Sequence, residues 1–133
     1  MNGNINQGKI LLFMPDRQKK EKILELCRKR NLHLQEISYD QIHTPILELV
    51  ETAGKKQRKL ETAPIFSVMP ELLIFCKMAD GQLDDFLKSY REAGIAPIHL
   101  KAVLTPYNLT WTPFELAEEL RKEREEILRR KQK

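Results

Sequence analysis

The sequence repeats one pattern of segments twice, and this repeat constrains the fold more than any other feature. The apolar run ILLFM at 10–14 corresponds to LLIFC at 72–76, and YDQIHTP at 39–45 corresponds to YNLTWTP at 107–113. Each half is expected to form a strand, a helix, a second strand and a second helix. We infer a duplicated βαβα unit. The alternative is a chance likeness, because Thr-Pro starts many helices for capping reasons alone.

The two halves span residues 9–53 and 71–128, and the segment 54–70 connects them. A chain of 133 residues fits a single domain over 1–133. Strands are expected at 9–15, 33–38, 71–78 and 98–105, and helices at 16–31, 44–53, 80–93 and 113–128. The expected N-caps of these helices are Asp16, Thr44, Asp80 and Thr112. The expected C-caps of the first and third helices are Asn31 and Gly94.

The apolar pattern of the strands indicates an α/β fold with a four-stranded sheet. The first and third strands, 9–15 and 71–78, are apolar on both faces and should be central, with the helices packing on the sheet. The second and fourth strands alternate more and should lie at the edges. Two arrangements remain open. One is an all-parallel sheet with helices on both faces, and the other is a ferredoxin-like, pseudo-two-fold sheet in which the halves meet antiparallel.

The composition is that of a soluble, mildly basic protein. The formal net charge is +4 and the isoelectric point is about 9.1, which is far below the charge density of a dedicated nucleic-acid coat. The N-terminal residues MNGNINQGK contain no basic n-region and no apolar h-region, so we expect no secretion signal, and no apolar run reaches the roughly 20 residues that a membrane helix needs. Cys27 and Cys76 lie among apolar neighbours and should be free thiols. A cytoplasmic location is expected.

The connector before the last helix holds the densest specific side-chain chemistry in the chain. It follows the end of a strand and precedes a helix N-terminus, which is where ligands tend to bind in α/β sheets. Its backbone N–H groups can hold an anion. The candidate ligand-binding or partner-binding residues are Lys101, Thr105, Tyr107, Asn108, Trp111 and Thr112.

A purely structural explanation of the same connector competes with that prediction. TPFE at 112–115 is a capping box, in which Thr112 caps the helix and Glu115 reaches back to the Thr112 amide. Asn108 can close an Asx-turn, and Trp111 can pack over the start of the helix. The sequence leaves both explanations open.

No catalytic or metal-binding motif stands out. His33, His43 and His99 lack metal-ligand spacing, and the chain contains no zinc, nucleotide-binding or nucleophile-elbow signature. We therefore expect no catalytic residue, no metal and no cofactor. An enzyme of unknown type remains an alternative that would need a cleft with a perturbed titratable pair.

The charged segments suggest partners only weakly. The last helix carries a charged face with the i,i+4 pairs Glu118–Lys122, Glu125–Arg129 and Glu126–Arg130, which is typical of a solvated surface. An alternative hypothesis is a homodimer or a protein partner bound through this helix. An RNA-associated protein is a further alternative, because Arg28, Lys29, Arg30, Lys55, Lys56, Arg58 and Lys59 supply positive charge. Few aromatic residues are available for stacking on bases.

The second half, over residues 71–125, resembles a bacterial family known as domain of unknown function 3783. The resemblance rests on the segment LKAVLTPYNLTWTPFELAEELRKE. The matching positions are Lys101, Ala102, Val103, Thr105, Pro106, Asn108 and Trp111. Members of the family often end in Glu-His, whereas this chain has Glu123 and Arg124. The family has no assigned activity, so the resemblance implies no reaction.

Taken together, the sequence favours a small cytoplasmic protein of uncharacterised function that acts as a non-enzymatic binding or regulatory module. Its working surface is expected in the Lys101–Thr112 region. Within that region the two copies of the repeat differ where Asn108 and Trp111 stand in place of Asp40 and His43. A functional site is expected where the copies differ.

Overall fold

The computed structural model describes residues 8–51 and 69–131 of the chain. The chain divides into two compact units. Unit 1 comprises Met1–Ile37 and Glu71–Leu104, and unit 2 comprises Ser38–Pro70 and Thr105–Lys133. Each unit thus takes the corresponding part of both sequence halves. The expectation of one domain over 1–133 stays a prediction.

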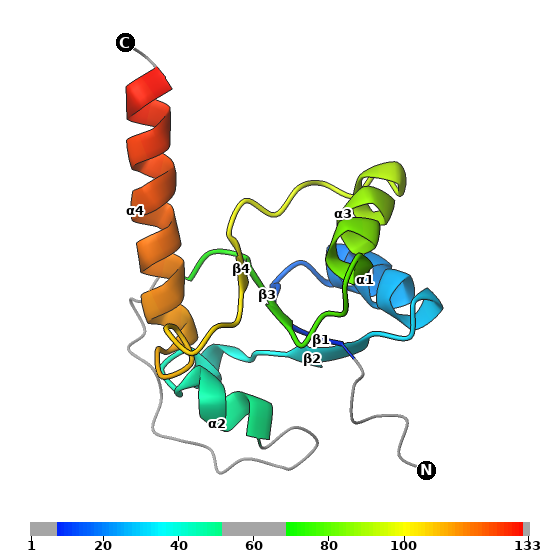
Figure 1. The fold of residues 1–133 in the computed structure, drawn as a ribbon, viewed down its shortest axis with the longest axis horizontal. Coiled ribbons are helices and arrows are strands. Elements are labelled where there is room, and N and C mark those ends of the chain that lie inside the picture. The colour runs from blue at the N-terminus through cyan, green and yellow to red at the C-terminus, as the bar shows by residue number, and fades with distance from the viewer. Residues whose placement is uncertain (1–7, 52–68, 132–133) are drawn as a thin grey trace. The chain divides into compact units, whose positions relative to one another are not determined.

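Unit 1 contains a four-stranded mixed sheet, whose strands are labelled in Figure 1. The strands are β1 (Lys9–Phe13), β2 (His33–Glu36), β3 (Leu72–Cys76) and β4 (Lys101–Val103). Their order in the sheet is β2-β1-β3-β4. The prediction that the first and third strands are central is confirmed, because β1 and β3 pair with each other and β2 and β4 lie at the edges.

The direction and the order of the strands test the two predicted arrangements. Each half forms a parallel pair, β1 with β2 and β3 with β4, but β1 and β3 pair antiparallel. The all-parallel sheet is therefore wrong. In a ferredoxin-like sheet a strand of one half separates the two strands of the other. Here β1 lies directly beside β2, so the ferredoxin-like strand order is wrong as well, although the two halves do meet antiparallel, through the β1–β3 pair. The connector 54–70 lies outside the described residues except for Met69 and Pro70.

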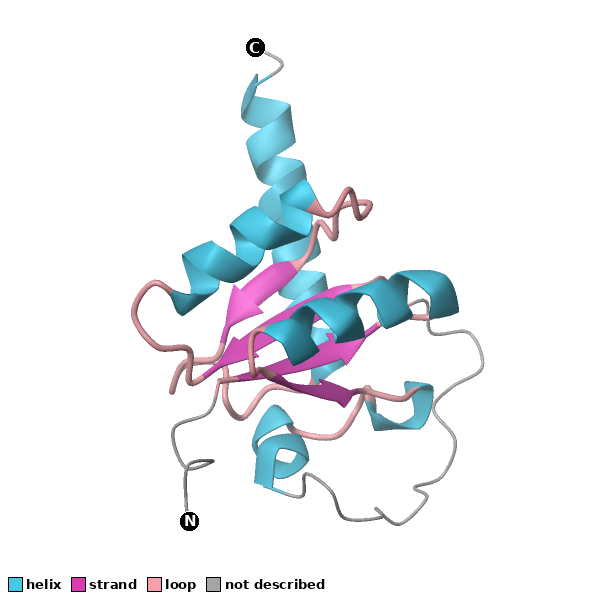
Figure 2. Ribbon diagram, turned by 90° about the vertical axis from the view of Figure 1, so that its right-hand side faces the viewer, coloured by secondary structure: helices cyan, strands magenta, loops and turns pink. Residues whose placement is uncertain are grey.

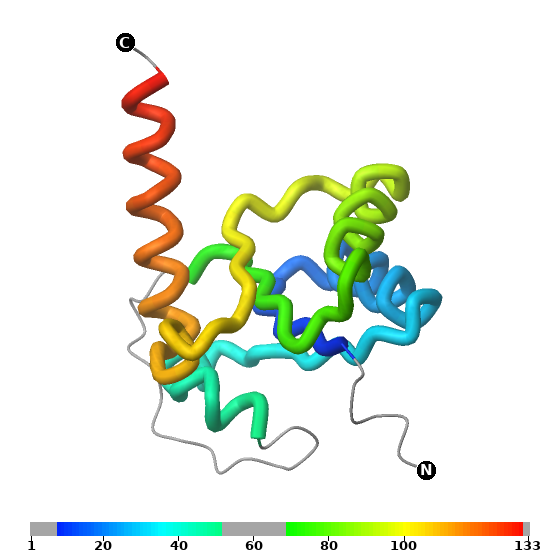
Figure 3. The backbone as a smooth tube through the Cα atoms, viewed as in Figure 1, coloured from blue at the N-terminus to red at the C-terminus, as the bar shows by residue number. Residues whose placement is uncertain are grey.

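Two helices of unit 1 cover one face of this sheet. They are α1 (Arg17–Lys29) and α3 (Gln82–Glu92), and they contact each other. Figures 1 and 2 show both on the same side of the strands, and Figure 3 traces the chain from β1 through α1 to β2. Their apolar residues form one core with alternate residues of the central strands, including Ile10, Leu12, Leu73, Phe75, Ile23, Cys27 and Phe86. The prediction of helices on both faces, which belonged to the all-parallel sheet, does not apply to unit 1.

The helix ends of unit 1 lie at or within one residue of the predicted positions. The Asp16 side chain accepts a hydrogen bond from the Lys19 amide at 3.1 Å, as an N-cap does. The C-caps of α1 and α3 are Arg30 and Ala93, one residue before the predicted Asn31 and Gly94, which follow them in the left-handed region at φ 56° and 73°. Asp80 is not the N-cap of α3. Gly81 takes that position in the left-handed region at φ 77°, and no cap hydrogen bond comes from a side chain there.

The two cysteines lie inside unit 1. Cys27 and Cys76 are free and buried, as expected. Burial disfavours the charged thiolate and raises the pKa of Cys27 to about 12 and that of Cys76 to about 11. Both thiols therefore stay protonated at neutral pH and behave as small apolar side chains.

Unit 2 contains a short 3-10 helix and two α-helices. They are η2 (Tyr39–Gln41), α2 (Ile46–Glu51) and α4 (Pro113–Lys131). The connectors that precede α2 and α4 are the repeated YDQIHTP and YNLTWTP stretches, and each accepts hydrogen bonding from backbone amides at the start of the helix that follows the other. In the described part of the chain, every helix is too short or too polar to cross a membrane.

Candidate functional site

Asn108 organises the connector that was predicted to hold the site. Its side-chain oxygen accepts a hydrogen bond from the Thr105 amide at 2.9 Å, and its own amide donates to the Thr105 hydroxyl at 3.3 Å. The Trp111 amide then donates to the Asn108 carbonyl at 3.1 Å. Only 8% of Asn108 is exposed. The side chain therefore holds the loop in shape and offers little surface to a ligand.

The two connectors of unit 2 satisfy each other's helix N-termini. At α2, the Ile46 amide donates to the Trp111 carbonyl at 2.8 Å and the Leu47 amide donates to the Leu109 carbonyl at 3.0 Å. At α4, the Phe114 amide donates to the Ile42 carbonyl at 3.0 Å. The first turn of a helix leaves such amides without a partner inside the helix. The amides most suited to holding an anion are therefore already used within unit 2.

The two repeated threonines, Thr44 and Thr112, differ in whether their hydroxyl caps the following helix. Thr112 forms the predicted capping box: its hydroxyl accepts from the Glu115 amide at 3.1 Å, and the Glu115 carboxylate accepts from the Thr112 amide at 2.9 Å. Thr44 was expected to cap α2 in the same way. Its hydroxyl is buried and has no hydrogen-bond partner among the described residues. The carbonyls of 109 and 111 serve the α2 amides instead.

This difference gives opposite expectations for one substitution at two sites. Thr112→Val removes a cap and should lower the free energy of unfolding by about 1 kcal/mol. Thr44→Val removes a buried hydroxyl without a partner and should leave the stability unchanged or raise it. Urea denaturation of both variants measures this. If Thr44→Val destabilised the protein as much as Thr112→Val does, the Thr44 hydroxyl would have a cap role after all.

Two aromatic rings of the connector stand at the surface. Tyr107 is 79% exposed, and its ring lies 5.5 Å from that of Trp111, measured between centroids, at an interplanar angle of 58°. Trp111 is half-buried. Aromatic residues that remain accessible beside one another are typical anchors of protein interfaces.

Trp111 also forms one end of a groove along α4. The groove has a volume of about 320 Å³. Its lining residues are Trp111, Phe114, Glu115, Glu118, Glu119 and Lys122. These positions follow the i, i+3, i+4 spacing of one helix face. Sequence reasoning treated that face as solvated and did not assign Phe114, Glu118, Glu119 or Lys122 to a site, although the spacing was visible.

The groove is acidic. Three carboxylates and one ammonium group line it. Glu118 accepts a hydrogen bond from Arg121 at 2.8 Å, and this bond lowers the pKa of the Glu118 carboxyl, so it stays ionised at neutral pH. Among the described residues, Glu119 forms no ion pair.

The ion pairs along α4 differ in part from the predicted ones. Glu126–Arg130 is confirmed at 2.7 Å. Glu118 and Glu125 both bind Arg121, at 2.8 Å and 2.6 Å, in place of their expected i,i+4 partners. A guanidinium group presents several donors in a fork and can serve two carboxylates at once.

A comparison with protein families finds a match over the region that contains the connector and the groove. Residues 71–127 match the family Domain of unknown function (DUF3783). This confirms the resemblance that the sequence predicted for the second half. No curated protein and no solved structure matches the chain. The DUF3783 region runs from β3 to α4 and includes every residue of the predicted site.

The residues of the predicted site all belong to the DUF3783 region, but they fall in different units. Thr105, Tyr107, Asn108, Trp111 and Thr112 belong to unit 2, whereas Lys101 belongs to unit 1. The Lys101 ammonium group donates to the Ile98 carbonyl at 2.7 Å. Lys101 also lines a separate pocket of about 220 Å³ in unit 1.

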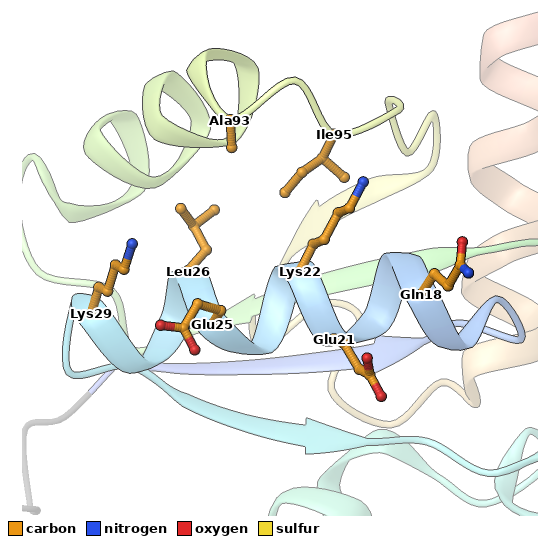
Figure 4. A pocket seen from close by; sticks show the side chains of 8 residues that line it. All are labelled: Gln18, Glu21, Lys22, Glu25, Leu26, Lys29, Ala93 and Ile95. Carbon is orange, nitrogen blue, oxygen red and sulfur yellow. The ribbon is translucent and has the colours of Figure 1, made fainter.

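Another cavity of unit 1 lies mostly outside the DUF3783 region. It has a volume of about 530 Å³ and lies between α1 and the segment that follows α3. In Figure 4, Leu26 points toward Ala93 and the Lys22 side chain reaches toward Ile95. Two lysines and two glutamates line it, so its charges balance and favour no class of ligand.

The basic cluster considered for RNA binding is partly neutralised. Arg28 pairs with Glu25 at 3.0 Å, and Arg30 pairs with Asp85 at 3.0 Å and also hydrogen-bonds to Ser89. The basic residues between 55 and 59 lie outside the described residues. Across residues 8–51 and 69–131, no cluster of three or more metal-ligating side chains occurs.

Proposed function

We propose that the protein is a non-enzymatic binding module that recognises a cationic side chain of a protein partner through the α4 groove. The observation that carries this proposal is the groove itself, which Trp111 lines together with Glu118 and Glu119. A tryptophan face attracts a lysine or arginine cation, and nearby carboxylates add charge attraction. Tyr107 extends the aromatic surface at the edge of the groove.

The electrostatic balance supports a cation over an anion. The carboxylates of the groove outnumber its one ammonium group, that of Lys122. The backbone amides of the connector, which were expected to hold an anion, are largely used by hydrogen bonds within unit 2. An arginine side chain fits best, because its planar group stacks on an aromatic ring and binds carboxylates in a forked geometry.

Titration with short peptides tests this function directly. The chain has one tryptophan, so its fluorescence reports on the groove alone. A capped glycine–arginine–glycine peptide should change the Trp111 emission in a saturable way. The effect should weaken with added salt, because exposed charges are screened over about 10 Å at 0.1 M salt. A capped glycine–glutamate–glycine peptide should leave the emission unchanged. An equal response to both peptides would contradict cation recognition.

We also propose that the two halves arose by duplication of a βαβα unit. The hydrogen bonds between the connectors support this. Ile46 and Phe114 occupy equivalent positions, two residues after the repeated threonine, and each donates its amide to a carbonyl of the other connector. Two copies of one unit that meet around a pseudo-two-fold axis would make such reciprocal contacts.

We further propose that the protein is bacterial and cytoplasmic. The bacterial source is proposed from the family resemblance, and the cytoplasmic location from the sequence. Free, buried Cys27 and Cys76 support a reducing compartment, because secreted proteins more often pair their cysteines.

A further inference from the structure

A small pocket in unit 1 differs in chemistry from the α4 groove. It has a volume of about 220 Å³ and lies between α3, the segment before β4, and the sheet. Typical sites for drug-sized ligands begin at roughly 300 Å³. The pocket therefore suits a ligand of fewer atoms. All its lining residues belong to the DUF3783 region.

The inner wall of this pocket is apolar. Leu73 and Ile98 are almost completely buried, and Leu87 adds a half-buried side chain at the side. Tyr90 lines the pocket as well, and its hydroxyl donates to the Ala96 carbonyl at 2.6 Å. Because that hydroxyl is already used, the ring contributes mainly carbon surface. A hydrocarbon group placed here would be removed from water on most sides.

Two cations stand at the exposed rim of the same pocket. They are Arg91, in the last turn of α3, and Lys101, the first residue of β4. The hydrogen bond to the Ile98 carbonyl holds the Lys101 ammonium group near the pocket wall and leaves it two further donors. No carboxylate lines the pocket, and within the described chain neither cation forms an ion pair.

We propose that this pocket binds a small organic monoanion with an apolar body. Its carboxylate would be held by Arg91 and Lys101, and its short hydrocarbon part would lie against Leu73 and Ile98. Charge-assisted hydrogen bonds between guanidinium or ammonium groups and a carboxylate are about twice as strong as neutral ones. The site lies in unit 1 and does not depend on the proposed recognition of cations by unit 2.

Hexanoate is a suitable probe, with 1-hexanol and hexylamine as matched neutral and cationic controls. The full chain labelled with ¹⁵N is titrated and followed by two-dimensional NMR. Hexanoate should cause saturable amide shifts in residues 87–101, with millimolar affinity as expected for so few atoms. Neither control should cause them at the same concentration. Equal shifts with 1-hexanol, or no saturable shift with hexanoate up to roughly 10 mM, would overturn the proposal.

Two variants that lose the same charge distinguish a direct contact at the pocket rim from a general effect of positive charge on hexanoate binding. Arg91→Gln should weaken hexanoate binding by about tenfold, because it removes one charge-assisted contact. Lys88→Gln removes the same charge from α3 at a position that does not line the pocket, and should change the affinity by less than about twofold. The spectra of both variants without ligand confirm folding. If Lys88→Gln weakened binding as much as Arg91→Gln, the rim contacts would not be specific and the proposal would fail.

Discussion

Replacing Asn108 by alanine should lower the free energy of unfolding by about 2 kcal/mol. The substitution removes the acceptor of the Thr105 amide, which would then be left without that partner. It also loosens the turn from which the Trp111 amide donates to the Asn108 carbonyl. Asn108 is buried, so water cannot easily replace the lost hydrogen bond. Urea denaturation followed by Trp111 fluorescence measures the change.

Tyr107→Ala is the matched control for this experiment. Tyr107 is the neighbouring residue, but it is 79% exposed and no hydrogen bond within the connector depends on its side chain in the described structure. Its replacement should change the stability by less than about 0.5 kcal/mol. Equal stability of the two variants would mean that Asn108 does not hold the connector, and a ligand role for its side chain would regain support.

Phe86→Ala should have the largest effect on stability, a loss of about 4 kcal/mol. Phe86 is completely buried in the core of unit 1. Its ring lies 5.7 Å from that of Phe75 in an edge-to-face arrangement and 6.1 Å from that of Tyr90, measured between centroids. The substitution leaves a cavity between α3 and the sheet. Chemical denaturation followed by far-ultraviolet circular dichroism reports the loss.

Leu24→Ala provides the comparison for Phe86→Ala. Leu24 lies on α1 in the same unit, but 40% of it is exposed. Its truncation should cost less than about 1 kcal/mol, because little apolar surface returns to water. If Phe86→Ala cost no more than Leu24→Ala, α3 would not pack on the sheet through Phe86.

Features that depend on neighbouring residues could be predicted from the sequence. Within the strands at 9–15 and 71–78, the stretches 10–14 and 72–76 are apolar at every position, and a strand buried on both faces belongs at the centre of a sheet. The cap at Asp16 and the capping box at Thr112 follow from side chains within three residues of the amides they serve. Such local chemistry is readable without knowledge of the rest of the fold.

Features that depend on distant segments could not be predicted in the same way. Parallel and antiparallel pairing of β1 with β3 place the same apolar residues in the sheet, so the pattern did not choose between them. Thr44 stands at a position typical of a helix N-cap, but the first amides of α2 already donate to the backbone carbonyls of residues 109 and 111. Only the meeting of the two connectors explains why, among the described residues, the Thr44 hydroxyl has no hydrogen-bond partner.

The candidate site shows the same division. The prediction identified Tyr107 and Trp111, which are accessible, together with Asn108, whose side chain serves the loop. It did not anticipate that Lys101 lines a pocket in unit 1 with Arg91, because that pocket lies between a helix end and an edge strand that are apart in the sequence. The charged face of α4 was read as solvated, and the aromatic wall that turns part of it into a groove was not foreseen.

The effect of single charges on peptide binding tests the central claim most directly. Glu119→Gln removes a carboxylate that lines the groove, whereas Glu123→Gln removes one a turn further along α4 that does not line it. Both variants are titrated with the capped glycine–arginine–glycine peptide while Trp111 fluorescence is followed. We expect Glu119→Gln to bind roughly threefold more weakly than the unchanged protein and Glu123→Gln to bind equally well. Equal binding by all three proteins, or the same loss in both variants, would contradict recognition of a cation by the groove.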